Sequence, residues 1–259
     1  MTPADDRPSE RGASGRGFLG RSVSDLRAVT TPGWPAVAAA VYCFVMLAPY
    51  YHPDLFSPGG GPGNGARARA VEGAWYLAVP ILLVAMLAVV RSLRRRRWPP
   101  IGRGDLRLTG CGWGTREGWR DALILFCLVL PILVTAALLK SFRTTYPLAP
   151  IARSGLRGLL IWQASHLLYM LGWEFIHRGW LLFGLERVMG RWAVLVVAVP
   201  FALLHAGKPE LEAYASFLAA FPLGWLALRS RSFLPAAALH WAAAAAFDVL
   251  VIIRTGGFG

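Results

Sequence analysis

The sequence predicts an all-α fold, a polytopic membrane bundle of about seven transmembrane helices, with six to eight as the range. Hydrophobic residues make up 56% of the 259 residues, and charged residues only 16%. The mean hydropathy is +0.48. A soluble protein of this length has a more charged surface. Several apolar runs approach the roughly 20 residues that a helix needs to cross the hydrocarbon core of a bilayer. The bilayer is therefore the expected solvent.

The apolar runs give the order of the spans. Polar, Gly/Pro-rich or Arg-rich connections separate them. The fourth run is longer than a bilayer requires, so we expect it to tilt or to project from the membrane, and the fifth run is short. The predicted spans cover residues 34–51, 73–91, 121–139, 156–186, 191–206, 214–229 and 233–253.

Three regions follow from this pattern. Residues 1–33 are polar and basic and lack the apolar core of a signal peptide, so they are expected to form a disordered cytoplasmic tail. Residues 34–150 hold the N-terminal transmembrane scaffold helices with an Arg-rich loop. Residues 151–259 hold the buried ionisable residues and form the expected functional core. The three cysteines are scattered, which predicts neither a disulfide framework nor a zinc site.

The net charge of +13 sits mainly in short segments between the apolar runs. Such segments set topology and meet anionic lipid head groups, so nucleic acid is not an expected partner. With seven spans, the basic tail, the loop 91–120 and the turns at 187–191 and 229–231 share one side, which the positive-inside rule makes cytoplasmic. A multi-pass protein of the bacterial inner membrane is expected. The loop between the third and fourth spans is also basic, although seven spans place it outside the cytoplasm, so an extra or re-entrant segment is an alternative. Its basic residues are Lys140, Arg143, Arg153 and Arg157.

Ionisable residues inside the last four spans are the functional candidates, because a charge within the bilayer is costly and is rarely kept without a use. Glu174 and Arg178 are four residues apart and share a helix face, so they can pair. A purely structural ion pair is the alternative for these two. The candidates are Glu174, His177, Arg178, His205, His240 and Asp248, with His166 further back.

Geometry brings these candidates together. If the fourth and fifth spans form a hairpin near Gly190, then Glu174 and His205 lie at nearly the same depth on antiparallel helices. His240 and Asp248 bracket that depth on the last span. A carboxylate can take a proton from water, imidazoles can orient the water or stabilise an oxyanion, and an arginine can hold the carboxylate. The set predicts hydrolysis.

The same residues resemble three motifs of the CPBP family over about residues 155–253. These are intramembrane endopeptidases that include type II CAAX prenyl proteases and bacterial Abi-type and bacteriocin-related proteins. Their pattern is Glu-Glu-x-x-x-Arg, then Phe-x-x-x-His, then His-x-x-x-Asn or Asp. The segments that match are Glu174–Gly179, Phe201–His205 and His240. The resemblance implies a metal-free glutamic endopeptidase in which Glu174 activates water.

The resemblance also implies roles for the other residues. Arg178 would orient Glu174, and the two histidines of the later motifs, His205 and His240, would position the water or stabilise the oxyanion. Asp248 would orient His240 or the water. A divalent metal such as zinc, held by Glu174, His205 and His240, remains an alternative, since carboxylate and imidazole ligands suit such an ion.

This chain departs from the motifs at three positions. Trp173 stands where the family has its first Glu, which the family usually uses as the catalytic carboxylate. Ala244 stands where Asn or Asp is expected, while Asp248 comes one turn later, and His177 replaces a frequent aromatic residue. These changes fit an active subgroup that uses Glu174 and Asp248, or a chain that has lost catalysis. The retained intramembrane charges favour the active interpretation.

Other intramembrane protease classes do not fit. A serine-type motif occurs only in the polar tail at 12–15, an aspartyl-type motif only in the Arg-rich loop at 102–105, and Trp173 replaces the first His of a zinc His-Glu-x-x-His motif. The expected partner is a membrane-associated protein or peptide, cut near its terminus. The resemblance to the CPBP family implies prenylated C-terminal peptides, bacteriocin leaders and C-terminal sorting tails of surface proteins as substrates, and nothing in the sequence chooses among them. A catalytically inactive scaffold, immunity factor or transporter-like protein is the alternative function.

Overall fold

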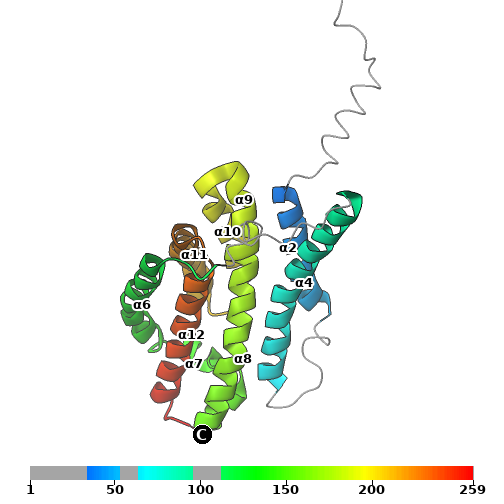
Figure 1. Cartoon of the computed structure of the whole chain (residues 1–259). Coiled ribbons are helices and arrows are strands. Elements are labelled where there is room, and N and C mark those ends of the chain that lie inside the picture. Colours follow the sequence, from blue (N-terminus) through cyan, green and yellow to red (C-terminus); the bar gives the residue numbers. More distant parts are fainter. Residues whose placement is uncertain (1–33, 53–63, 96–111, 259) are drawn as a thin grey trace, which may run out of the picture.

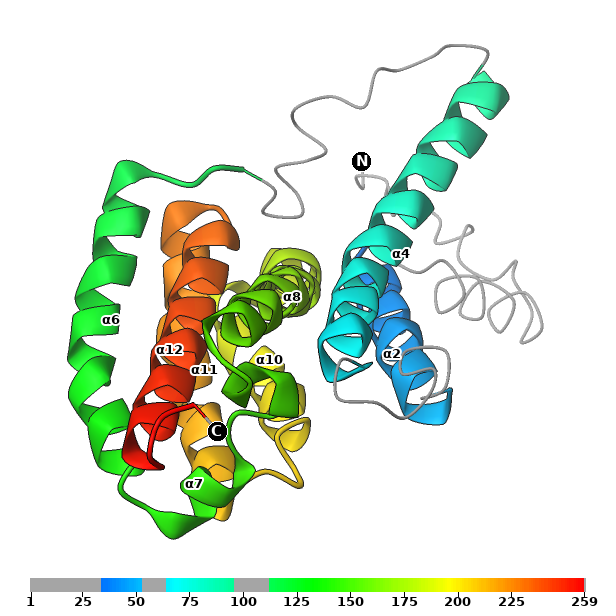
Figure 2. The same ribbon diagram turned by 90° about the horizontal axis from the view of Figure 1, so that it is seen from below.

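The computed structural model describes residues 34–52, 64–95 and 112–258, and all regular secondary structure in these ranges is helical. The predicted disordered tail, residues 1–33, lies outside the described residues, as does most of the Arg-rich loop. Figures 1 and 2 show helices grouped around a central rod. On one side of it lie α2 (Trp34–Tyr51) and α4 (Asn64–Arg95), and on the other lie α11 (Glu210–Ser230), α12 (Leu234–Arg254) and the outermost helix α6 (Arg116–Ala136).

The central rod is the long fourth span of the prediction. It consists of α8 (Leu156–Glu174), the π-helix η2 (Phe175–Leu181) and α9 (Leu182–Met189). The chain then reverses at Gly190, whose φ of 56° suits glycine because it has no Cβ. A short 3₁₀-helix η3 (Gly190–Trp192) leads into α10 (Ala193–Leu203). The predicted hairpin near Gly190 is therefore present.

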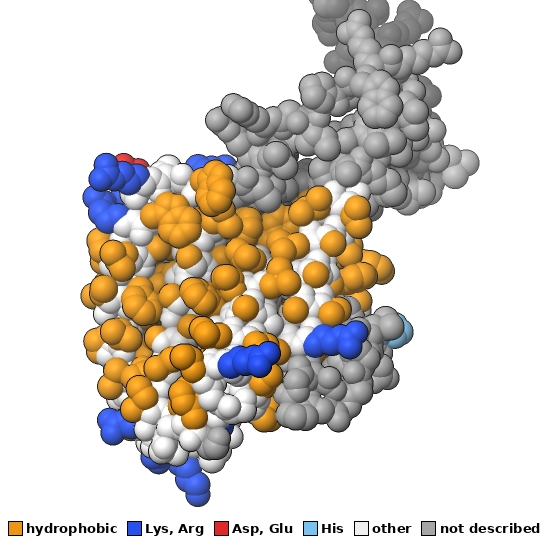
Figure 3. All heavy atoms as spheres, turned by 60° about the horizontal axis from the view of Figure 1, so that its bottom comes forward, with side chains coloured by type: hydrophobic (Ala, Val, Ile, Leu, Met, Phe, Trp, Pro, Cys, Tyr) orange, Lys and Arg blue, Asp and Glu red, His pale blue; other side chains and the backbone are white. Residues whose placement is uncertain are grey.

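The protein is an integral membrane protein with an all-α bundle, as predicted. Within the described residues, α6, α11 and α12 are each 21 residues long and apolar enough to cross a membrane. The outermost helix α6 turns large apolar side chains outward, and Leu128 and Ile132 are each 65% exposed. Figure 3 shows a face covered mainly by hydrophobic side chains, with few Lys and Arg side chains on it. Such a face suits lipid tails.

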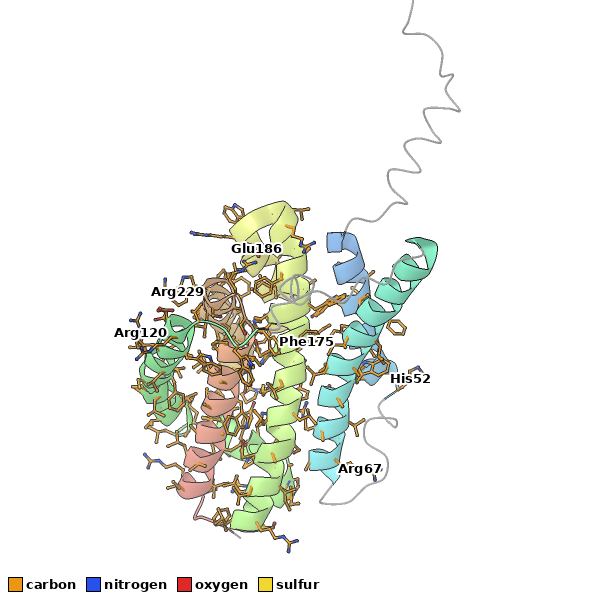
Figure 4. All side chains as sticks on the ribbon, viewed as in Figure 1. His52, Arg67, Arg120, Phe175, Glu186 and Arg229 are labelled. Carbon is orange, nitrogen blue, oxygen red and sulfur yellow. The ribbon has the colours of Figure 1, made fainter. Side chains whose placement is uncertain are left out.

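Basic and acidic side chains pair at one end of the bundle, where α6 begins, α11 ends and the hairpin turns. Arg229 donates to Asp121 at 2.6 Å, and Arg231 donates to both carboxylate oxygens of Glu186 at 2.7 and 2.8 Å. Figure 4 shows Arg120, Arg229 and Glu186 at this end and Arg67 towards the other. The turns that the sequence assigned to one side of the membrane therefore lie at one end of the fold.

The loop between α6 and α8 lies at the opposite end and holds two short elements, α7 (Lys140–Thr145) and η1 (Pro150–Arg153). Both are much shorter than a membrane span. The Tyr146 hydroxyl bonds Glu212 at 2.7 Å, and Arg153 donates to the Tyr146 carbonyl at 2.8 Å. Burial and the Glu212 carboxylate raise the pKa of Tyr146, so its phenol stays a protonated donor. This network fastens the loop to the start of α11.

Close backbone contact holds α4 against α8. A Cβ at Gly73 would collide with the carbonyl of Leu168, and a Cβ at Gly172 would collide with the carbonyl of Gly73. Small residues allow membrane helices to approach in this way, because packing rather than hydrophobicity drives their association within lipid. The contact fixes α4 beside the part of α8 that leads to Glu174.

Candidate active site

The central candidate, Glu174, lies where the α-helix of the rod gives way to a π-helix. It is the last residue of α8, and all seven residues of η2 that follow it are buried. π-helical turns are rare and often occur at functional sites, because the wider turn changes where the following side chains point. His177 and Arg178 both lie in this turn. The local structure therefore sets the directions of three candidates at once.

Glu174 bonds two partners, an arginine and a histidine, through one of its oxygens. The Arg178 Nη1 donates to Oε1 of Glu174 at 3.0 Å, as the four-residue spacing predicted. The Nδ1 of His240, on α12, lies 2.6 Å from the same oxygen. Glu174 is 0% exposed and Arg178 1%, while the His240 side chain is 19% exposed. Burial at this depth requires such pairing, since an isolated charge would be far too costly.

Two polar atoms of this cluster are buried without a hydrogen-bond partner among the described residues, Oε2 of Glu174 and Nη2 of Arg178. Buried polar groups are normally paired, so each exception needs an explanation. One carboxylate oxygen is thus fixed by two donors while the other is left to act as an acceptor. A carboxylate held in this way can take a proton from a water molecule.

Phe201 of α10 packs against Arg178 and both motif histidines. The Arg178 guanidinium lies over its ring, 3.8 Å from the centroid, in a cation–π arrangement. The ring centroids of His205 and His240 lie 4.8 and 5.8 Å from that of Phe201. Phe201 is 1% exposed. This aromatic ring therefore connects the motif histidines to the arginine of the π-helix.

His205 lies in the turn that follows α10 and is 6% exposed. Its Nδ1 lies 2.7 Å from the carbonyl oxygen of Phe201. A carbonyl only accepts, so Nδ1 carries the proton and Nε2 is left as an acceptor in the neutral ring. No hydrogen bond joins His205 to Glu174 within the part of the chain that the structure describes. His205 instead lies against Phe201 and against Trp173, the residue before Glu174.

The comparison with protein families agrees with these motifs. Residues 155–246 match the family described as type II CAAX prenyl endopeptidase Rce1-like. This segment is therefore similar to that family. The Rce1-like segment contains Glu174, Arg178, His205 and His240, and the resemblance to the CPBP family is thereby confirmed. Neither a curated protein nor a solved structure matches the chain.

Trp173 fills the place of the first motif carboxylate in the Rce1-like segment with an aromatic ring. It is 6% exposed. Its centroid lies 4.5 Å from that of His177 and 6.3 Å from that of His205. Where the family motif has a carboxylate, this chain therefore has an aromatic ring that packs against His177 and His205. Glu174 is left as the one carboxylate of the first motif.

Asp248 lies outside the Rce1-like segment and away from Glu174. Its Oδ2 accepts from Trp162 Nε1 at 2.7 Å and from Gln163 Nε2 at 2.9 Å, which joins α12 to α8 near the other end of the rod. No hydrogen bond to His240 is present among the described residues. His166 also lies in this region, stacked between Trp162 and Tyr169 at centroid distances of 5.0 and 5.7 Å. Nothing in the sequence pattern indicated Trp162 or Gln163 as the partners of Asp248.

The metal alternative does not find a ligand set in this arrangement. Among the described residues, no three His, Cys, Asp or Glu side chains lie in a geometry that could hold one ion. The nitrogen of His205 that faces Phe201 is used by a carbonyl, and Oε1 of Glu174 is shared between two donors. A metal-free reaction at Glu174 stays a prediction, which metal removal tests.

Proposed function

We propose that the chain is an intramembrane endopeptidase that uses Glu174 as the general base on water and cuts a membrane-associated protein or peptide near its terminus. The observation that carries this proposal is the state of the Glu174 carboxylate. Arg178 and His240 hold Oε1, while Oε2 is buried without a partner among the described residues. A base fixed at one oxygen and unpaired at the other is suited to taking a proton from water.

The proposed reaction is a hydrolysis. Oε2 of Glu174 accepts a proton from water, and the water oxygen attacks the carbonyl carbon of the scissile amide. The tetrahedral intermediate then breaks its C–N bond, and the leaving nitrogen takes the proton from Glu174. The products are a new carboxyl terminus and a new amino terminus. General-base assistance of this type contributes about 10²- to 10⁴-fold to a rate.

The two histidines take different roles in this proposal. With Nδ1 bonded to the Phe201 carbonyl, the neutral His205 presents Nε2 as an acceptor, which suits it to orient the water. His240 turns Nδ1 towards Glu174, so Nε2 is the ring nitrogen left to face the water or the oxyanion. Of the residues that hold the Glu174 carboxylate, His240 is the more exposed. Water and substrate are therefore proposed to arrive from its side.

The substrate and the setting belong to the same proposal. The family's description names CAAX prenyl endopeptidases, which makes a prenylated C-terminal peptide one proposed substrate class beside bacteriocin leaders and sorting tails. The protein is proposed to lie in the bacterial inner membrane with its N-terminus in the cytoplasm. The pairing of the basic turns at one end of the bundle supports that orientation.

One observation favours a second candidate function, a catalytically inactive membrane scaffold. Trp173 and Ala244 remove two of the polar motif residues, and Glu174 is fully buried in a pair that would also stabilise a bundle without chemistry. An immunity or transporter-like role would need this pair only for structure.

Comparative peptidomics separates the two candidates. Cells that express the wild-type protein and cells that express Glu174→Gln at the same membrane level are compared for the termini of their membrane proteins. Glu174→Gln keeps the shape of the side chain and removes the base. Termini that depend on the wild type and vanish in Glu174→Gln support the endopeptidase. If a stable Glu174→Gln protein gives the same termini as the wild type, the glutamate mechanism is wrong.

A further inference from the structure

The first membrane helix contributes a side chain to the surroundings of the candidate site. The Tyr42 hydroxyl of α2 lies 3.0 Å from Nε2 of His177, and both residues are buried, at 7% and 0% exposure. Their rings meet edge to face with centroids 5.3 Å apart. Tyr42 is distant in sequence from every motif and lies outside the family segment 155–246. Sequence motifs gave no reason to select it.

The direction of the hydrogen bonds follows from the chemistry of the partners. His177 Nδ1 lies 2.7 Å from the carbonyl oxygen of Trp173, which can only accept. Nδ1 therefore carries the proton, and in the neutral ring Nε2 accepts the proton of the Tyr42 hydroxyl. Two consecutive hydrogen bonds thus lead from α2 through His177 to the backbone of the residue before Glu174.

This chain of bonds ends at the segment that presents the base and its partner. Trp173 precedes Glu174, and His177 precedes Arg178 within the π-helix. The helix that carries Tyr42 is itself held in place, because Trp75 of α4 donates from Nε1 to the Val45 carbonyl at 3.0 Å. A displaced α2 would release His177, whose bond to Trp173 lies in the turn where the α-helix becomes a π-helix.

We propose that Tyr42 is a positioning residue for the Glu174 site, acting through His177. The inference rests on the proposed function, and it extends the site beyond the family segment to a helix that the sequence assigned to the scaffold. The contact between Tyr42 and His177 depends on a position where this chain departs from the family pattern, since His177 stands where the family often has an aromatic residue. Tyr42 touches none of the reacting groups and fixes the segment that does.

The test compares Tyr42→Phe with a matched control. Tyr42→Phe keeps the ring and removes the hydroxyl, and kcat is expected to fall about 3- to 10-fold with KM unchanged, which corresponds to one lost hydrogen bond. The control is Tyr76→Phe, which removes another buried hydroxyl, one that bonds Glu72 rather than the site. It is expected to keep the wild-type kcat. Equal losses in the two variants would show a general packing effect and overturn the inference.

The route through His177 is tested in a second background. In His177→Phe, which restores an aromatic residue, Tyr42→Phe is expected to cause no further loss, since residues that act as one unit are not additive. A second loss of the same size would mean that Tyr42 acts elsewhere. If Glu174→Gln is inactive while Tyr42→Phe has wild-type kcat, only the role of Tyr42 fails, and the proposed function stands.

A measurement without activity completes the test. In protein labelled with ¹⁵N-histidine, the wild-type His177 ring is expected to show the tautomer protonated at Nδ1, with Nε2 hydrogen bonded. Tyr42→Phe is expected to move the Nε2 resonance of His177, while Tyr76→Phe leaves it in place. An unmoved resonance in Tyr42→Phe would overturn the inference even if the protein cleaves no substrate.

Discussion

Nδ1 of His240 and Oε1 of Glu174 lie 2.6 Å apart, although 66 residues separate them in the sequence. This contact joins α12 to the rod at the last residue before the π-helix. It also leaves Arg178 and His240 on the same carboxylate oxygen, so any change in one partner alters the electrostatic balance of the other two.

The two motif histidines are expected to differ in how their loss acts. His240→Ala removes one of the two partners of a buried carboxylate and is expected to lower both activity and stability, by up to about 3–5 kcal/mol in the free energy of unfolding. His205→Ala removes one bond to a backbone carbonyl, so it is expected to abolish cleavage at a stability cost of about 1 kcal/mol. Cleavage in membranes and thermal unfolding in detergent measure the two effects. If His205→Ala lowers the free energy of unfolding as much as His240→Ala does, the expected difference between the two histidines is wrong.

Asp248→Asn is expected to lower activity only partially, because Asp248 lies with Trp162 and Gln163 and not with Glu174. Asn keeps an acceptor oxygen for the two donors but loses the charge that strengthens those bonds. The unfolding temperature should fall together with the activity. Trp162→Phe, which removes one of the donors from the other side, serves as the matched variant and should behave similarly. Complete loss of cleavage in a stable Asp248→Asn protein would place Asp248 in the chemistry.

Cleavage is expected to persist after metal removal. A reaction that uses a carboxylate base needs no bound ion, and the described residues offer no ligand set of three. Purified protein treated with 1,10-phenanthroline or EDTA should keep its rate, and elemental analysis should find less than one equivalent of zinc. An inhibited enzyme that recovers on addition of zinc would favour the metal alternative.

The orientation in the membrane is expected to follow the basic turns. Reporter fusions after Arg97 should read cytoplasmic, and fusions at Gly63 and Pro209 should read extracytoplasmic, since the positive-inside rule places the Arg-rich loop inside. Alkaline phosphatase is active only outside the cytoplasm and green fluorescent protein fluoresces only inside it, so the two fusions at one position should give opposite results. Periplasmic activity at Arg97 would reverse the orientation and place the turn at Gly190 outside.

The sequence alone was sufficient to predict the helices and one contact of the candidate site, the pair of Glu174 and Arg178. Long apolar runs specify spans, because a bilayer leaves few alternatives to a helix of sufficient length. The predicted hairpin at Gly190 is present because glycine tolerates the positive φ at which the chain reverses. The pairing of Glu174 with Arg178 needed only the periodicity of a helix, which places residues four apart on one face.

The tertiary structure decided which side chains meet across helices. The partners of Asp248, the bond between His240 and Glu174, and the bond from Tyr42 to His177 all depend on how each helix is rotated about its axis. That rotation is set by packing between helices, including the close approach of Gly73 to Gly172, and no local pattern encodes it. The π-helix after Glu174 is a second reason why these contacts could not be predicted from the sequence. Its wider turn shifts every following side chain from the direction that a regular α-helix would give, so the surroundings of His177 and Arg178 follow only from the folded chain.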